Sequence, residues 1–126
     1  MPPNPTKSIL VVEDDVDIRE GIVGILRDEG YAVDGAGNGL EALDFLRAPQ
    51  RVLPAIILLD LMMPVMNGWQ FRAEQQQDAG LSAIPFVVIS ADSSVKQKSD
   101  AIGAAAFLKK PIELKDLLAV VARYCE

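Results

Sequence analysis

The feature that most constrains the fold is a fivefold alternation between short apolar runs and segments with helical periodicity. Four of the runs are nearly continuous, as expected for strands covered on both faces of a sheet, and the second run alternates. After each run, apolar residues recur every three or four positions, which is typical of helices that bury one side. The predicted strands span residues 9–12, 31–36, 55–59, 86–89 and 105–108, and the predicted helices begin near residues 17, 39, 69, 95 and 113.

This alternation predicts a doubly wound α/β domain, in which right-handed crossovers place helices on both faces of a five-stranded parallel sheet. The most apolar run, residues 55–59, is expected at the centre of the sheet. Asp17 with Glu20 should cap the start of the first helix, and Gly30 should end it. In such sheets the ligand crevice lies outside the carboxyl ends of the strands, so residues that follow strands are the candidates for function.

The length, composition and net charge of the chain exclude several classes of function. The 126-residue chain has the length of one domain. No histidine and a single cysteine exclude a disulfide framework, a Cys/His zinc site, a histidine general base and a phosphohistidine donor. A net charge of −6 argues against a nucleic-acid partner, and the longest apolar run, residues 117–122, is far shorter than the roughly 20 residues of a membrane helix. We therefore expect a flexible leader over residues 1–7, one domain over residues 8–126, no membrane partner and a cytoplasmic location.

Polar residues follow four of the predicted strands. Each has an ordinary explanation when taken alone, because acids often cap turns, serines bond to their own loops and lysines are usually solvated. The parallel topology nevertheless brings them to one edge of the sheet. The residues are Glu13, Asp14 and Asp15 after the first strand, Asp60 after the third, Ser90 after the fourth and Lys110 after the fifth.

Clustered carboxylates repel one another unless a cation neutralises them, and Mg²⁺ prefers such oxygen ligands. We assign Glu13 and Asp14, which lie nearest the strand, to the metal site together with Asp60, and we expect Asp15 to be a loop residue. An aspartate beside a divalent cation can attack a phosphoryl group without losing a proton. The Ser90 hydroxyl and the Lys110 ammonium, expected at the same edge, can bind phosphoryl oxygens. The site is therefore suited to accept a phosphoryl group.

These residues make the chain resemble the receiver domain of two-component response regulators over residues 8–124. The most specific segment is residues 60–68, an aspartate followed by a Met-Pro-Val-Met-Asn-Gly loop, and Ser90-Ala91 and Lys110-Pro111 complete the pattern. The resemblance implies a flavodoxin-like fold of five βα units with strand order 2-1-3-4-5. It implies that Asp60 takes phosphate from a partner histidine kinase or histidine phosphotransfer protein, in a cytoplasmic phosphorelay. It also implies that the backbone carbonyl of Met62 joins the carboxylates in binding Mg²⁺ or Mn²⁺, and that the peptide bond before Pro111 is cis.

The resemblance further implies a conformational switch. In receivers, the hydroxyl at the position of Ser90 moves toward the phosphate, and the aromatic side chain at the position of Phe107 turns inward. Phenylalanine stands here where many relatives carry tyrosine, so the switch must act through packing alone. We expect the output to be a protein-binding face built from the fourth helix, the fifth strand and the fifth helix, which a downstream protein target recognises.

Two other classes of function fit these residues less well. A small Mg²⁺-dependent phosphatase could use Asp60 as its nucleophile, but such enzymes carry a second acid two residues later, where this chain has Met62. A flavin-binding domain of the same topology would place a phosphate beside the three acids after the first strand, which would repel it. We therefore expect no enzyme beyond the catalysis of its own phosphoryl acceptance and loss. A stand-alone regulator, a relay protein and a domain of a hybrid kinase all agree with the sequence.

Overall fold

The computed structural model describes residues 8–49 and 52–125, and the leader expected over residues 1–7 lies outside this range. Within these residues, five strands alternate with five helices, as the apolar pattern predicts. In the described residues, no helix is long and apolar enough to cross a membrane. The elements are β1 (Ser8–Val12), α1 (Val16–Asp28), β2 (Ala32–Ala36), α2 (Gly39–Arg47), β3 (Ile56–Asp60), α3 (Gly68–Gln77), β4 (Phe86–Ser90), α4 (Val95–Ile102), β5 (Ala106–Lys109) and α5 (Leu114–Cys125).

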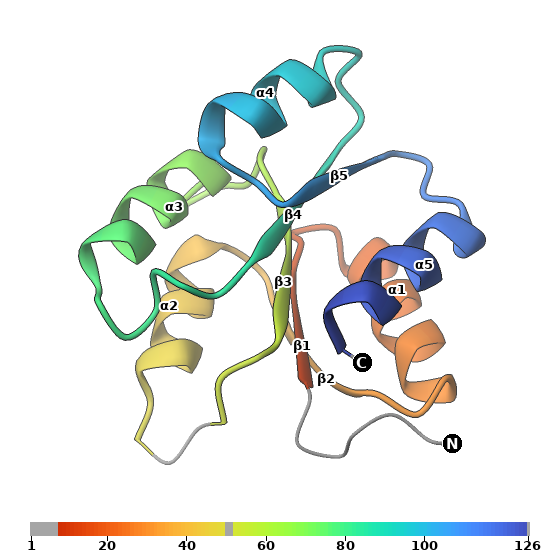
Figure 1. Cartoon of the computed structure of the whole chain (residues 1–126), viewed down its shortest axis with the longest axis horizontal. Coiled ribbons are helices and arrows are strands. Elements are labelled where there is room, and N and C mark those ends of the chain that lie inside the picture. The colour runs from red at the N-terminus through yellow and green to blue at the C-terminus, as the bar shows by residue number, and fades with distance from the viewer. Residues whose placement is uncertain (1–7, 50–51, 126) are drawn as a thin grey trace.

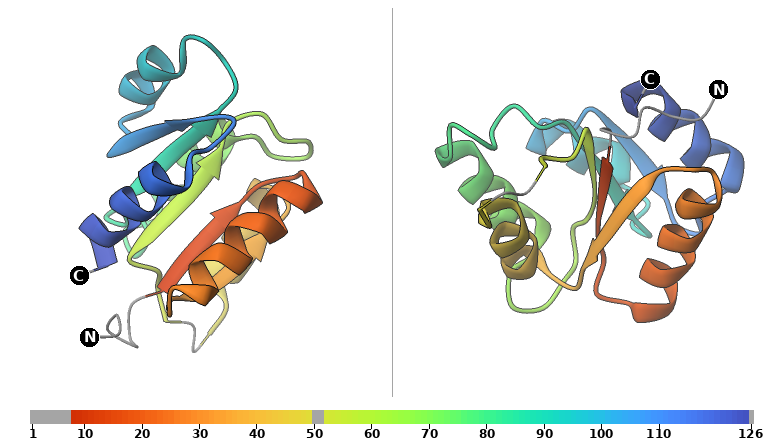
Figure 2. Two further views of the ribbon diagram at one scale, coloured as in Figure 1. Left: turned by 90° about the vertical axis from the view of Figure 1, so that its right-hand side faces the viewer. Right: turned by 90° about the horizontal axis from the view of Figure 1, so that it is seen from below.

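The strands form one parallel sheet in the order β2-β1-β3-β4-β5, which confirms the predicted fold and the central place of the third strand. Helices α1 and α5 cover one face of the sheet, and α2, α3 and α4 cover the other (Figure 1). The two further views show the same three layers, with the sheet twisting between the helices (Figure 2). This arrangement follows from right-handed crossovers, whose direction changes between β1 and the later strands.

Two apolar clusters hold these layers together, and alternate residues of each strand contribute to one or the other. In β1, Leu10 and Val12 pack toward α2, α3 and α4, whereas Ile9 and Val11 pack toward α1 and α5. The apolar side chains of β3 divide in the same way and are fully buried. Because both faces of β1, β3 and β4 are covered, these strands read as continuous apolar runs in the sequence.

Element boundaries differ from the sequence prediction in a few places. The cap of α1 is Asp15, whose side chain accepts a hydrogen bond from the Ile18 backbone N–H at 3.0 Å, so the prediction of Asp17 as the cap is wrong. Asp15 itself precedes the helix, in the loop where the sequence predicts it. Asp17 lies instead in the first turn. Gly30, with a φ of 98°, follows the end of α1 as predicted. Strand β5 spans Ala106–Lys109, one residue later than expected.

The register of the sheet decides which residues meet at its carboxyl edge. Val12 pairs with Leu59, and Asp60 pairs with Ile89. Ser90 pairs with Lys109, so the residue that follows β5 lies beside the end of β4. The polar residues at the ends of β1, β3, β4 and β5 therefore lie at one edge, as the sequence predicts.

Candidate functional site

The polar residues that follow the strands are positioned by backbone contacts of the sheet. The Glu13 backbone N–H donates to the Ala36 carbonyl at 3.0 Å, which extends the β1–β2 pairing by one residue. The Lys110 backbone N–H donates to the Ser90 carbonyl at 2.9 Å and extends the β4–β5 pairing in the same way. Asp60 is the last residue of β3, in the middle of the sheet. Four strand ends thus present their side chains to one shallow cavity of about 530 Å³.

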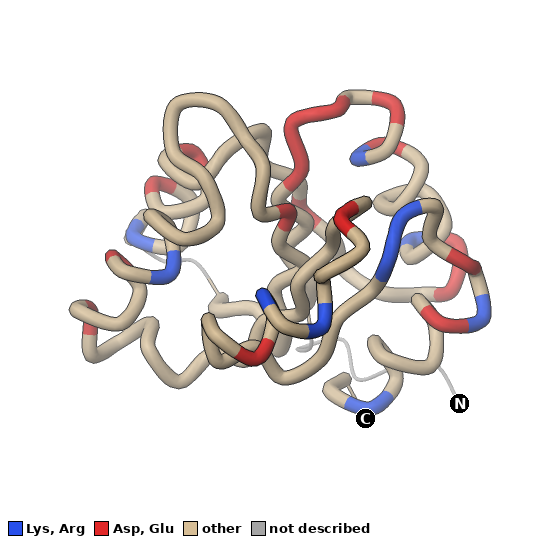
Figure 3. Tube along the Cα trace, turned by 90° about the horizontal axis from the view of Figure 1, so that it is seen from above, with Lys and Arg blue, Asp and Glu red and all other residues tan. Residues whose placement is uncertain are grey.

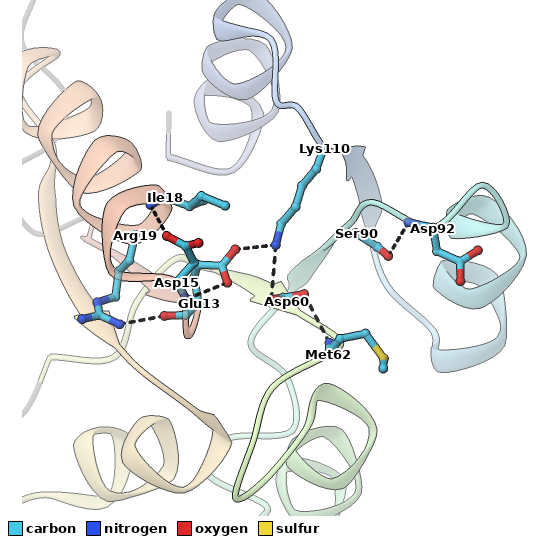
Figure 4. Close-up of polar contacts among 9 residues, drawn as sticks. All are labelled: Glu13, Asp15, Ile18, Arg19, Asp60, Met62, Ser90, Asp92 and Lys110. Atoms are coloured by element: carbon cyan, nitrogen blue, oxygen red, sulfur yellow. Dashed lines mark hydrogen bonds and ion pairs between the residues drawn. The ribbon is translucent and has the colours of Figure 1, made fainter.

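Lys110 extends between two buried carboxylates, as Figure 4 shows. Its Nζ lies 2.6 Å from Glu13 Oε1 and 3.3 Å from Asp60 Oδ2. The other oxygen of each carboxylate accepts a backbone hydrogen bond, from the Asp15 N–H to Glu13 at 3.2 Å and from the Met62 N–H to Asp60 at 3.2 Å. The two carboxylates are therefore oriented by the strand ends and by one shared ammonium group.

Burial sets the electrostatics of this group. Glu13 is fully buried and Asp60 is 3% exposed. Burial, together with the nearby Asp60, raises the pKa of Glu13 above its ordinary value, and the pairing with Lys110 offsets only part of this effect. Burial acts to lower the pKa of Lys110, but the two carboxylates outweigh it and hold the ammonium charged. The cluster therefore contains more negative charge than its lysine can balance.

The acids at this edge have the composition of a divalent cation site. Carboxylate oxygens of Glu13, Asp14 and Asp60 lie within 4.8 Å of one another. When all three are ionised, one ammonium leaves two negative charges, which equals the charge of one divalent cation. Figure 3 shows an unbroken acidic stretch on the loop after β1, at the edge of the sheet. Asp15 is not part of this cluster, because its side chain caps α1.

Ser90 lies at the end of β4 and is 3% exposed. Its hydroxyl oxygen accepts a hydrogen bond from the Asp92 backbone N–H at 3.1 Å, so it is turned toward its own loop (Figure 4). Phe107, 39% exposed, pairs in register with Val88, two residues before Ser90. Residues two apart in a strand share a face, so Phe107 and Ser90 lie on the side of the sheet that carries α4.

The loop between β3 and α3 is tied down at both ends. The Gly68 N–H donates to the Leu61 carbonyl at 3.0 Å, and the Gly39 N–H donates to the Met66 carbonyl at 2.9 Å. Gly68 is required there, because a Cβ atom would lie 2.7 Å from Leu61 Cδ2 and 2.8 Å from Leu61 Cα. The close approach of Leu61 therefore explains why the segment 60–68, which carries the family resemblance, ends in a glycine.

Several contributors to the site were not predicted from the sequence. Arg19 Nη1 donates to the Glu13 carbonyl at 2.8 Å and so supports the strand end, although nothing in the helical pattern distinguishes this arginine. Val65 has a φ of 66°, which no local signal predicts for a β-branched residue.

The Lys110–Pro111 peptide bond is cis, as the resemblance implied.

Comparisons with known proteins show which family the chain is similar to. The family model of the response regulator receiver domain matches residues 9–122. Response regulator Rre1 of Synechocystis sp. is 36% identical over 117 residues, which cover 90% of this chain and 49% of Rre1. The solved structure of the chemotaxis response regulator CheY4 of Vibrio cholerae is 30% identical with a TM-score of 0.81, over 94% of this chain and 98% of that one. The non-phosphorylated HemR receiver domain from Leptospira biflexa is 28% identical with a TM-score of 0.77, over 95% and 94%.

The chain therefore belongs to the response regulator receiver domains, the phosphoacceptor modules of two-component systems. These domains interact with histidine kinases and downstream effectors, and they are signalling modules rather than conventional enzymes. The alternative of a small phosphatase finds no support among these relatives. The chain spans about half the length of Rre1 and of several other curated relatives that it matches.

Proposed function

We propose that Asp60 is the phosphoacceptor, and that it receives a phosphoryl group from a phosphohistidine on a histidine kinase or a histidine phosphotransfer protein in the cytoplasm. The observation that carries this proposal is the placement of a buried aspartate at the base of a cavity, with one carboxylate oxygen bonded to Met62 N–H and the other paired with Lys110. We include in the proposal that residues 8–126 form the receiver unit.

The chemistry requires no general base. The ionised carboxylate of Asp60 attacks phosphorus, an O–P bond forms, and the P–N bond to the donor imidazole breaks. Lys110 lies beside the attacking carboxylate and can bind a phosphoryl oxygen with its ammonium. Ser90 can donate its hydroxyl to a second oxygen once it turns away from Asp92. Later attack by water on the acyl phosphate would return the free carboxylate, which is the loss reaction expected from the sequence.

Mg²⁺ or Mn²⁺ fits the donor set of the acidic edge. Glu13, Asp14, Asp60 and the backbone carbonyl of Met62 would hold the ion, in keeping with the clustered oxygens and their excess negative charge. A bound divalent cation supplies charge neutralisation for the phosphoryl oxygens as they approach the acids. Burial and the neighbouring Asp60 raise the pKa of Glu13 in the metal-free site, and a bound cation would oppose both effects by favouring the ionised carboxylate.

An apolar groove beside the site is a suitable docking place for the phosphodonor. It has a volume of about 300 Å³ and lies between α1 and the β5–α5 loop, where Lys110 and Pro111 form one wall. Ile25, 38% exposed, and Leu114, 55% exposed, line its open side. We propose that an apolar helix face of the phosphodonor packs here, because Lys110, whose ammonium pairs with Asp60, lines both this groove and the cavity at the edge of the sheet.

The output is proposed to be a change of the face built from α4, β5 and α5. A phosphoryl group brings additional oxygens and negative charge to Asp60, and Ser90 must turn toward them to form a hydrogen bond. Phe107, partly exposed on the same side of the sheet, can then move into the space that Ser90 leaves. A downstream protein target would distinguish the two arrangements of this face, provided it binds one of them more tightly.

The test is incubation with Mg²⁺ and acetyl phosphate, followed by measurement of intact mass. The wild-type protein should gain one phosphoryl group, and Asp60→Asn should gain none. Asp44→Asn is the matched control, because Asp44 is an exposed carboxylate on α2 and should leave the gain unchanged. Phosphorylation of Asp60→Asn at the wild-type level would contradict the assignment.

A further inference from the structure

The carboxylate of Asp92, two residues after Ser90, is held by groups from its own loop and from α4. One oxygen, Oδ1, accepts hydrogen bonds from the Ser94 N–H at 2.8 Å and from the Ser94 hydroxyl at 2.6 Å. The other, Oδ2, forms an ion pair with Lys98, which lies on α4. Lys98 and then Ser94 hold the pKa of Asp92 well below its usual range, so the carboxylate is charged at neutral pH. Asp92 also lines the cavity that contains Asp60.

Lys98 makes a second contact, with α3. Its ammonium lies over the ring of Trp69 on α3, 5.9 Å from the ring centroid, within the range of a cation–π contact. Trp69 is the only tryptophan in the chain. We call the three residues Asp92, Lys98 and Trp69 the loop clasp, because together they connect the β4–α4 loop with α4 and α3.

The loop clasp is coupled to Ser90 through one hydrogen bond, from the Asp92 N–H to the Ser90 hydroxyl oxygen. When Ser90 turns toward a phosphoryl group on Asp60, this bond either breaks or draws the loop with it. In the second case the Asp92 carboxylate moves away from Lys98, whose position is set by α4 and Trp69. Both routes lose an interaction that the present arrangement contains.

We propose that Lys98 is a positioning residue for the phosphoryl-accepting site: by holding Asp92 it keeps the β4–α4 loop, and with it Ser90, turned away from Asp60, so that Ser90 reaches the phosphoryl group only at the cost of its bond to Asp92 or of the clasp. This inference rests on the proposed function, since it concerns the response of Ser90 to phosphorylation of Asp60. Lys98 does not touch the reacting atoms, and its effect is on the equilibrium between two orientations of the serine.

The experiment measures the affinity of the protein for beryllofluoride at saturating Mg²⁺, by amide chemical shifts. Lys98→Met and Asp92→Asn both open the clasp, and each should bind beryllofluoride about two- to fivefold more tightly than wild type, the range expected for a partly exposed ion pair. The double variant should bind no more tightly than either single variant, because both changes remove the same interaction. Lys96→Met is the matched control: Lys96 lies on the same helix but pairs with Asp100 at 3.3 Å on the surface, and its loss should leave the affinity unchanged.

A purely electrostatic effect gives a different pattern. Loss of the Lys98 charge would then weaken binding of the anion, loss of the Asp92 charge would strengthen it, and the two effects would add in the double variant. The role of the clasp would be overturned if the affinity for beryllofluoride changed in opposite directions in Lys98→Met and Asp92→Asn, or if it changed in neither variant. Binding of beryllofluoride by the wild type would still uphold the proposed function in that case. Failure of the wild type to bind beryllofluoride would instead overturn the proposed function, and with it this inference. As a second readout, binding should change Trp69 emission in wild type and Lys96→Met, and an equal change in Lys98→Met would also contradict the clasp.

Discussion

Replacing Val65 by glycine is expected to stabilise the protein. Val65 has a φ of 66°, in the left-handed region that β-branched residues rarely adopt. The Met66 N–H donates to the Pro64 carbonyl at 2.7 Å, so Val65 is the central residue of a turn closed over three residues. A γ-turn of this positive-φ form is rare and strained. Glycine carries no Cβ and adopts this conformation without steric cost.

The size of the effect follows from three contributions. A non-glycine residue in a sparsely populated region costs about 1–3 kcal/mol, and glycine removes that cost. Glycine also gives the unfolded chain more freedom, which opposes the gain by roughly 0.4–1 kcal/mol. Val65 is 74% exposed, so the loss of its side chain removes only about 0.5 kcal/mol of burial. The balance is a stabilisation of about 1 kcal/mol, or roughly 4 °C in the melting temperature.

The assay is urea and thermal denaturation without metal, with two controls. Val65→Ala removes almost the same apolar surface but keeps the Cβ atom, so it should gain nothing. Val52→Gly changes a residue that is 65% exposed in another loop and is not among the positive-φ residues, so it should destabilise the protein slightly. Equal stability of Val65→Gly and Val65→Ala would refute the argument that steric strain at this turn is relieved by glycine.

Four other substitutions test the acidic edge and its loop. The pKa of Glu13 is raised in the folded state, so the protonated side chain stabilises the metal-free protein at pH values below the pKa of the unfolded state. This stabilisation is lost as the pH rises through the pKa of the folded state. In denaturant titrations of the metal-free protein, the free energy of unfolding of Glu13→Gln should therefore fall less than that of wild type between pH 4.5 and pH 8. Saturation with Mg²⁺ at 100 times its dissociation constant should raise wild-type stability by about 2.7 kcal/mol, and Asp14→Ala should lose most of this gain. Asp15→Ala should keep the gain but lose about 1 kcal/mol at every Mg²⁺ concentration, because it removes the cap of α1. Gly68→Ala should destabilise the protein by about 1–3 kcal/mol and slow phosphorylation, since the new Cβ would press on Leu61 and the backbone of Asp60; unchanged melting would contradict the steric role of the glycine.

The fold and the meeting of the polar residues could be predicted from the sequence because they depend on patterns that many residues share. Each core strand is buried on both faces and so reads as an apolar run, and the most apolar of these runs belongs to the central strand. Once the strands are parallel, residues that follow them must lie at one edge. Asp60 and Lys110, 50 positions apart, are thus predicted to meet by topology alone, and their atoms lie 3.3 Å apart.

The details that were missed depend on single contacts. Asp15 and Asp17 have the same side chain and both suit a cap, and only the backbone geometry beside Ile18 decides that Asp15 accepts the bond. The strained turn at Val65 runs against local preference and is held in place by the backbone bonds that tie the loop to α2 and to Leu61. The loop clasp joins residues of two helices and a loop through side-chain tips, which no periodicity describes.

Lys110 connects the resting cluster with the phosphorylated one. Lys110 pairs with both Glu13 and Asp60, and in the proposed function only Asp60 is phosphorylated. Glu13 is fully buried and fixed by its backbone bond to the β2 strand end, so it would keep the ammonium at the edge when the Asp60 carboxylate gains a phosphoryl group and becomes an acyl phosphate. The ammonium then needs to move only from one oxygen on Asp60 to another a short distance away. Glu13 would therefore serve two purposes, as a metal ligand and as an anchor for the lysine, and its burial is what makes the second purpose effective.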